Sequence, residues 1–263
     1  MKLELISRQP ESVKGPPLLF VHGAWHGAWC WDEYFLPYFA RHGYPAYALS
    51  LRGHGQSEGK AGRAGLPEYL EDIHQVAAEI GEPAVIVGHS MGGYLVLKYL
   101  EKYPAAGGVL LAAMSPAGVP SSWRKYGRPL YKLANLALRG APMPIPKNPH
   151  MLQKMLFSPE MPTEQVRRYA RWLQNEALGF FFDYLLLEQP DPQKLKKLPM
   201  LVQRPTRDLM RERLCGPEIA QLYQGSYHEY PAIAHDMMLD PRWQEVAADM
   251  LEWLASLPSA TRP

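Results

Sequence analysis

The sequence predicts an α/β protein with a mostly parallel central sheet, and the order of its apolar segments supports this fold class. Short apolar runs alternate with longer segments of helical periodicity in residues 1–117 and 199–263. Such alternation is typical of parallel strands covered by helices on both faces. Residues 118–198 carry helical patterns broken by prolines, and a structureless loop of that length is uncommon. We therefore expect an α/β core at 1–117 and 199–263 with a helical cap (lid) inserted at 118–198.

The strands are predicted from apolar runs that end at glycine, proline or polar residues. In order along the chain they cover residues 3–6, 17–22, 44–51, 83–88, 107–114, 199–203 and 225–230. The strand at 17–22 stops at Gly23, and the strand at 44–51 leads into a glycine-rich turn. No convincing strand is expected between residues 118 and 198.

The helices are predicted from apolar positions at helical spacing. In the core they cover residues 31–41, 67–80, 91–103 and 242–254, and in the insertion 126–138, 151–157, 163–178 and 180–188. The second of them carries a proline at its first position, where the missing N–H costs nothing. Between the first two inserted helices, the prolines of APMPIPKNPH forbid a regular helix.

Composition excludes several classes of protein. The 263 residues are 47% hydrophobic and 21% charged, which excludes disorder, and a net charge of +2 without a basic cluster argues against a nucleic-acid partner. Two cysteines, Cys30 and Cys215, and no CxxC or HExxH motif indicate neither a disulfide framework nor a metal site. The N-terminus lacks an apolar signal region and no run reaches 18 apolar residues, so we expect a cytoplasmic protein without a membrane span.

The motif that carries chemistry is Gly88-His89-Ser90-Met91-Gly92, which matches G-x-S-x-G. It directly follows an apolar strand and directly precedes a helix, as a nucleophile elbow requires. A serine on such a sharp turn is forced outward, and small neighbours let the backbone segments approach closely. The alternative is a phosphate-binding turn, but no GxGxxG or GK[ST] motif accompanies it. Ser90 is therefore the predicted nucleophile.

A nucleophilic serine needs a base, and the base needs an acid to orient it. His235 lies after the strand at 225–230 and before the last helix, so it is the predicted base. Asp208 ends the turn that follows the strand at 199–203, which gives the chain order Ser…Asp…His. Glu212 is the alternative acid, whereas Asp236 is too close to His235 in sequence to orient it easily.

An oxyanion also needs hydrogen-bond donors. Gly23 permits a tight turn that would aim the N–H of Ala24 at the site, and the N–H of Met91 lies at a helix N-terminus. His22 is expected to be a structural histidine that pins this loop, and the spacing of His26 from it does not define a metal site.

Several segments occur in an order that resembles the α/β-hydrolase superfamily over essentially the whole chain. They are LLFVHGAWHGAWCW, LRGHGQS, VGHSMGG, RPTRD and AHDMMLDP. Within the superfamily, the chain resembles bacterial lysophospholipase-like and carboxylesterase-like hydrolases. The resemblance implies an α/β-hydrolase fold, a catalytic triad and an oxyanion hole. The implied triad is Ser90, Asp208 and His235, and the implied oxyanion hole is formed by the backbone N–H groups of Ala24 and Met91.

One position departs from the family pattern. The acid turn usually begins with glycine, whereas here it begins with Pro205. If this proline shifts the turn, Glu212 replaces Asp208 as the acid.

The expected function is hydrolysis of a small-molecule carboxylic ester, of short to medium acyl chain, without cofactor or metal. Serine at position 90 argues against dehalogenases and epoxide hydrolases, and Asp236 in place of lysine argues against hydroxynitrile lyases. Lysophospholipase or monoacylglycerol lipase, perhydrolase and carbon–carbon bond hydrolase activity remain alternatives on the same triad. The alternative of another class is a ligand receptor that keeps the triad without turnover.

Overall fold

The computed structural model describes residues 1–60, 62, 64–116, 136, 139–186, 189–195, 198–209 and 216–258. Its central feature is a seven-stranded sheet of order β1-β3-β2-β4-β5-β8-β9, in which only β1 runs antiparallel to its neighbour. The strands are β1 (Glu4–Arg8), β2 (Leu18–Val21), β3 (Ala46–Ser50), β4 (Val85–His89), β5 (Gly107–Leu111), β8 (Met200–Pro205) and β9 (Ser226–Tyr230). The predicted α/β class with a mostly parallel sheet is confirmed.

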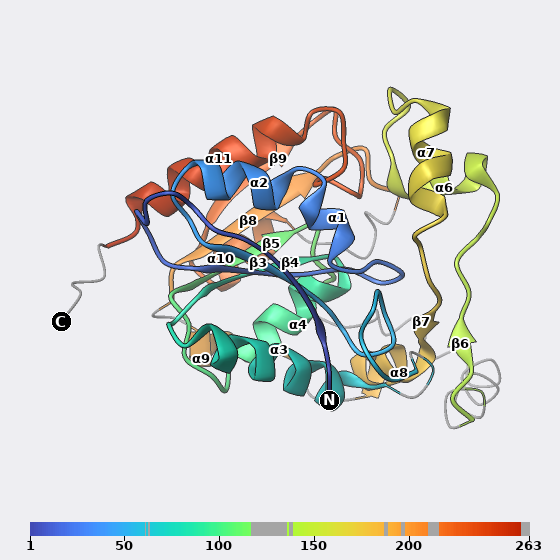
Figure 1. Ribbon diagram of the computed structural model, residues 1–263, viewed down its shortest axis with the longest axis horizontal. Coiled ribbons are helices and arrows are strands. Elements are labelled where there is room, and N and C mark those ends of the chain that lie inside the picture. Colours follow the sequence, from blue (N-terminus) through green and yellow to red (C-terminus); the bar gives the residue numbers. More distant parts are fainter. Residues whose placement is uncertain are drawn as a thin grey trace.

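Helices cover both faces of this sheet (Figure 1). On one side lie α1 (Trp29–Asp32), α2 (Phe35–Arg41) and α11 (Trp243–Ser256), and on the other α3 (Leu66–Ile80), α4 (Met91–Leu100) and α10 (Pro217–Leu222). Among the described residues, no helix combines the length and the apolar character needed to cross a bilayer.

The apolar strands explain why two helical layers form. In β2, Leu18 and Phe20 pack into the core beneath α1, α2 and α11, whereas Leu19 and Val21 pack into the core beneath α3 and α4. All four side chains are fully buried. A strand whose two faces are both apolar cannot leave either face in water, so helices are required on both sides.

Between β5 and β8 lies a long segment whose described residues 136, 139–186 and 189–195 add no strand to the main sheet. We call these described residues the inserted segment. It contains β6 (Pro142–Met143), α6 (Pro149–Leu156), α7 (Thr163–Ala170), β7 (Glu176–Ala177), α8 (Leu178–Leu186) and α9 (Pro192–Leu195). In Figure 1, α6, α7 and the β6–β7 ribbon stand at one end of the molecule, and the last turn of α11 lies toward the other end. All but one residue of the helix predicted at 126–138 lie outside the described residues.

Three elements differ from the sequence prediction. The helix expected at 31–41 is divided into α1 and α2, because the ring of Pro37 clashes with the carbonyl of Glu33 in a continuous helix. The helix expected at 163–178 ends at Ala170 and is followed by β7. The expectation of no strand in the insertion is also corrected, since β6 and β7 pair over two residues each, which is too short for an alternating pattern.

Helix α4 approaches the sheet closely because its first turn carries glycines. A Cβ on Gly92 would lie 2.6 Å from the carbonyl oxygen of His22 and closer still to that of Val21. A Cβ on Gly88 would in turn collide with the carbonyl of Gly92. Strand β4, strand β2 and α4 therefore meet at a point where only hydrogen atoms fit.

This packing predicts that Gly92→Ala destabilises the fold. In an exposed helix the same substitution stabilises by about 0.5–1 kcal/mol, but here the methyl group must displace backbone oxygens of β2. We expect the free energy of unfolding in urea to fall by about 1–3 kcal/mol. A variant at least as stable as the wild type would contradict this close approach.

Candidate active site

Ser90 lies on a strained turn between β4 and α4. Its φ of 52° and ψ of −116° place it in a region that non-glycine residues rarely adopt. The surrounding backbone holds this conformation: the Ser90 N–H donates to the carbonyl of Leu111 at 2.9 Å, and the Ser90 carbonyl accepts from the N–H groups of Gly93 and Met114, each at 3.0 Å. This is the sharp strand-to-helix turn that the G-x-S-x-G motif predicts.

The predicted base and acid are in contact. His235 Nδ1 lies 2.7 Å from Asp208 Oδ2, and both residues are only 4% exposed. Burial alone lowers the pKa of His235, but the Asp208 carboxylate beside it raises the pKa above the ordinary value of 6.5. A buried imidazole held by a carboxylate is suited to accept a proton and to be stabilised once charged.

The turn that begins at Pro205 still delivers Asp208 to the histidine. The N–H of Thr206 donates to the carbonyl of Tyr230 at 3.0 Å, and the N–H of Arg207 donates to that of Ile233 at 3.3 Å. These bonds tie the end of β8 to the loop that carries His235. Glu212, the alternative acid, lies outside the described residues.

The loop after β2 passes directly against Ser90. A Cβ on Gly23 would lie 3.0 Å from the Ser90 Cβ and 2.7 Å from His89 Nδ1, so only glycine fits there. The N–H of Ala24, the next residue, donates to no acceptor in the part of the chain that the structure describes. Met91 is the first residue of α4, where a backbone N–H has no partner within the helix. Of the two predicted oxyanion donors, Met91 directly follows Ser90, and Ala24 directly follows Gly23, the residue packed against Ser90.

His22 pins this loop, in agreement with its expected structural role. Its Nε2 accepts from the N–H of Leu51 at 3.0 Å, which leaves the proton on Nδ1 to donate to the carbonyl of Gly23 at 2.8 Å. Burial, and then the charge of His54, lowers the pKa of His22 to about 3. The ring is therefore neutral and serves as a fixed hydrogen-bonding bridge.

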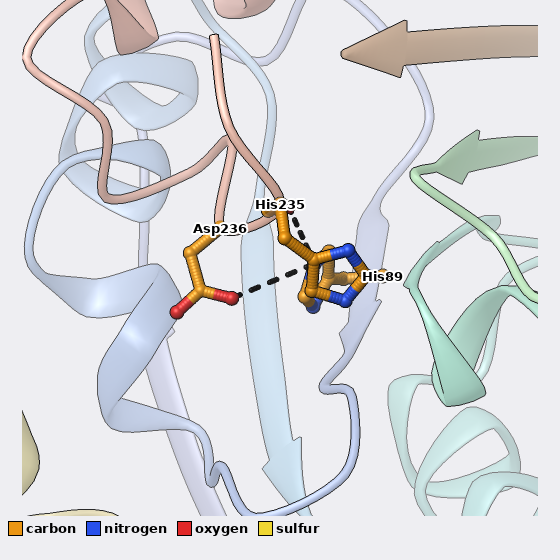
Figure 2. Close-up of side chains that lie close together, drawn as sticks. All are labelled: His89, His235 and Asp236. Carbon is orange, nitrogen blue, oxygen red and sulfur yellow. Dashed lines mark hydrogen bonds and ion pairs between the residues drawn. The ribbon is translucent and has the colours of Figure 1, made fainter. Parts of the chain in front are cut away.

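Sequence reasoning missed a buried cluster beneath the candidate base. Figure 2 shows Asp236 and His235 on one loop, with the ring of His89 beside them. Asp236 Oδ2 lies 3.0 Å from His26 Nε2, and Asp236 Oδ1 lies 3.8 Å from His89 Nε2. Burial raises the pKa of Asp236, but the contacts with His26 and His89 bring it below its ordinary value.

Within this cluster His89 supports the backbone of His235. Its Nε2 lies 2.9 Å from the carbonyl oxygen of His235, and the two rings are 4.8 Å apart. Burial, and then the charge of His235, lowers the pKa of His89 to about 3, so the neutral ring donates this hydrogen bond from Nε2. In the sequence, His89 directly precedes Ser90 and Asp236 directly follows His235, which could have marked both residues as candidates. Only the fold, however, brings His89 and Asp236 close together.

His89, His235 and Asp236 also offer ligand atoms within 4.8 Å of one another. A metal requires neutral histidine rings with a free lone pair. Here His235 Nδ1 is engaged by Asp208, and His89 Nε2 is directed at the carbonyl of His235. The geometry therefore fits hydrogen-bonded support for the base rather than a metal site.

A second acid that sequence reasoning missed is Glu176, in β7 of the inserted segment. It is fully buried, its Oε1 accepts from the hydroxyl of Tyr69 at 2.5 Å, and its Oε2 lies 3.2 Å from His54 Nε2. Burial raises the pKa of Glu176, but His54 and Tyr69 bring it below its ordinary value. In the sequence this residue falls within an expected helix, so no pattern marked it as buried.

Comparisons with known proteins agree with this architecture. The sequence model of the Alpha/beta hydrolase family matches residues 18–249. Esterase PIR7B of Oryza sativa subsp. japonica is 37% identical over 114 residues, covering 39% of this chain and 42% of the relative. Bifunctional esterase/perhydrolase DCH of Acinetobacter calcoaceticus is 33% identical over 118 residues, covering 43% of this chain and 42% of the relative. The match thus spans about two fifths of the length of these curated relatives.

A solved structure is similar over nearly the whole chain. The monoacylglycerol lipase of Paleococcus ferrophilus has a TM-score of 0.70 at 21% identity, covering 98% of this chain and 100% of the lipase. At that identity the likeness concerns the fold alone.

The contact between His235 and Asp208 predicts how His235 titrates. We expect the midpoint of its ring titration, followed by NMR, to lie above pH 6.5 in the wild type. Asp208→Asn removes the charge that raises the pKa and leaves the burial that lowers it, so the midpoint should fall by about 1–3 pH units. Glu71→Gln, which changes a carboxylate paired with Arg52 at the surface, is the control. An unchanged midpoint in Asp208→Asn would mean that Asp208 is not the partner.

Proposed function

The chain belongs to the alpha/beta hydrolase family, and on that premise we propose that it is a serine hydrolase of carboxylic esters. One observation carries the proposal. Ser90 stands in a strained turn at the carboxyl edge of the sheet, and the residue before it, His89, bonds to the histidine of a buried imidazole–carboxylate pair. The esterase names of the curated relatives support the same reaction.

In the proposed reaction Ser90 Oγ attacks the ester carbonyl carbon while His235 Nε2 takes its proton. Asp208 holds the imidazole by its Nδ1 and stabilises the positive charge that forms. The N–H groups of Ala24 and Met91 stabilise the negative charge on the carbonyl oxygen. His235 then donates the proton to the departing alkoxide. Water, deprotonated by His235, attacks the acyl-enzyme, the carboxylic acid leaves, and His235 returns the proton to Ser90 Oγ.

We propose that the inserted segment is part of a cap, within residues 118–198, over a core formed by 1–117 and 199–263. Its helices α6 and α7 share one apolar core with the sheet: Leu152, Leu156, Val166 and Tyr169 pack with the residues beneath α1, α2 and α11. A cap joined to the core in this way can shape the acyl site and set the chain length it accepts.

A second candidate activity is perhydrolysis. One curated relative is named as both esterase and perhydrolase, and the same acyl-enzyme would serve both reactions. Hydrogen peroxide would then replace water as the attacking nucleophile and release a peracid. Comparing peracid formation with ester hydrolysis at equal acyl-donor concentration distinguishes the two, whereas a ligand receptor on this fold would turn over neither.

The proposed nucleophile is tested by Ser90→Ala. We expect kcat on a p-nitrophenyl ester to fall by a factor of about 10⁶, since nucleophile and base act as one unit. The fold should survive, because the backbone bonds of Ser90 do not involve its side chain. Retention of a tenth of the wild-type turnover in a clean preparation would exclude Ser90 as the nucleophile.

The cap is tested with an ester series from acetate to palmitate, lysophospholipid included. Each buried methylene contributes about 0.8 kcal/mol of binding, so two more, from butyrate to hexanoate, should raise kcat/KM by up to roughly tenfold until the pocket is full. We expect a maximum at short to medium chains. A flat profile would reject the cap as the element that sets specificity.

A further inference from the structure

Trp25, the residue after the proposed oxyanion donor Ala24, has an unusual backbone. Its φ is 69°, a left-handed conformation that is a genuine outlier for a bulky residue. Such conformations persist only where the surrounding structure holds them. What holds Trp25 therefore also determines the path of the loop that carries Ala24.

All three hydrogen-bonding groups of Trp25 are held by the inserted segment. Its backbone N–H donates to Glu176 Oε2 at 3.3 Å, and its indole N–H donates to the carbonyl of Met143 at 3.3 Å. Its carbonyl accepts from the N–H of Gln174 at 2.8 Å. Met143 and Glu176 are register partners in the β6–β7 ribbon, so both strands of the ribbon accept hydrogen bonds from Trp25.

Glu176 is itself fixed from the core side. Its Oε1 accepts from the hydroxyl of Tyr69 on α3 and, at 2.6 Å, from the N–H of Ala177. Its Oε2 faces His54, and both of these side chains are fully buried. A carboxylate with this many donors around it cannot rotate without leaving some of them unpaired in the interior.

These contacts constrain the direction of the Ala24 N–H. The peptide that joins Ala24 to Trp25 is held at both ends, because its N–H bonds to Glu176 and its C=O lies 2.8 Å from His26 Nδ1. The preceding peptide is held at the Gly23 carbonyl, which accepts from His22 Nδ1. In a trans peptide the N–H points opposite to the C=O, so the Ala24 N–H is fixed facing away from His22.

We propose that Glu176 is a positioning residue for the oxyanion hole, acting on Ala24 through Trp25. On this proposal the inserted segment does more than cover the substrate. It also positions the Ala24 N–H, one of the two proposed donors of the oxyanion hole. This inference rests on the proposed function, because it assigns Glu176 a role in the same reaction.

The test is Glu176→Gln, with Glu164→Gln as the matched control. Glutamine offers one acceptor oxygen and an NH₂ group to the same set of donors, so the grip on Trp25 should loosen. Glu164 is an exposed acid on α7 of the same inserted segment. We expect Glu176→Gln to lower kcat on a p-nitrophenyl ester by about tenfold or more, toward the 10²–10³-fold cost of losing one oxyanion donor. KM should change by less than about twofold, and the control should match the wild type.

Binding of a transition-state analogue distinguishes a role of Glu176 in positioning the oxyanion donor from a role in stability alone. A trifluoromethyl ketone forms a tetrahedral oxyanion on the serine, so its affinity should fall by the same factor as kcat/KM. Should Glu176→Gln fail to fold, Tyr69→Phe takes its place, because it removes the hydroxyl that donates to Glu176 Oε1 and should lower both quantities severalfold. Loss of thermal stability with unchanged kcat and analogue affinity would overturn the proposal.

Hydrogen exchange distinguishes this inference from the proposed function. The Trp25 amide should exchange faster in Glu176→Gln than in the wild type, whether or not any ester is hydrolysed. If exchange is faster in the variant but the wild type hydrolyses no ester, Glu176 does hold Trp25 in place, and the proposed function is rejected. Unchanged exchange would overturn the inference while ester hydrolysis stands.

Discussion

The arrangement of the site depends on one constraint, the left-handed turn that carries Ser90. A serine in this conformation costs about 1–3 kcal/mol, so the surroundings must hold it. They do so by bringing α4 so close to β2 that Gly92 cannot carry a side chain, and by anchoring the Ser90 backbone to the ends of β5 and α4. The close packing of α4 on the parallel sheet, which Gly92 permits, thus places Ser90 at the edge of the sheet.

Two buried acid–histidine pairs secure the loops on either side of that turn. Asp236 and His26 link the loop of the candidate base to the loop after β2, while Glu176 and His54 link the inserted segment to the core. Buried charges are costly unless they are paired and hydrogen-bonded, and here each pair joins segments far apart in the sequence. These side-chain contacts thereby help to fix the relative positions of the segments they join.

The fold and the principal candidate residues could be predicted from sequence because their signals are local. Apolar runs, glycine turns and G-x-S-x-G each occupy fewer than a dozen residues, and chain order then points to Asp208 and His235. The β6–β7 ribbon and the role of Glu176 could not be predicted. A two-residue strand has no periodicity, and Glu176 is buried only because Trp25, Tyr69 and His54 meet it from other parts of the chain.

The proposed function requires that Ser90, placed by the strained turn and deprotonated by His235, reacts as a nucleophile. The most direct measurement is reaction with a fluorophosphonate, which modifies activated serines, followed by peptide mass spectrometry. We predict one phosphonyl group per chain, located on Ser90, with labelling that slows as pH falls through the raised pKa of His235. A label on another residue, or hydrolysis of esters by a protein that stays unlabelled, would exclude Ser90 as the nucleophile.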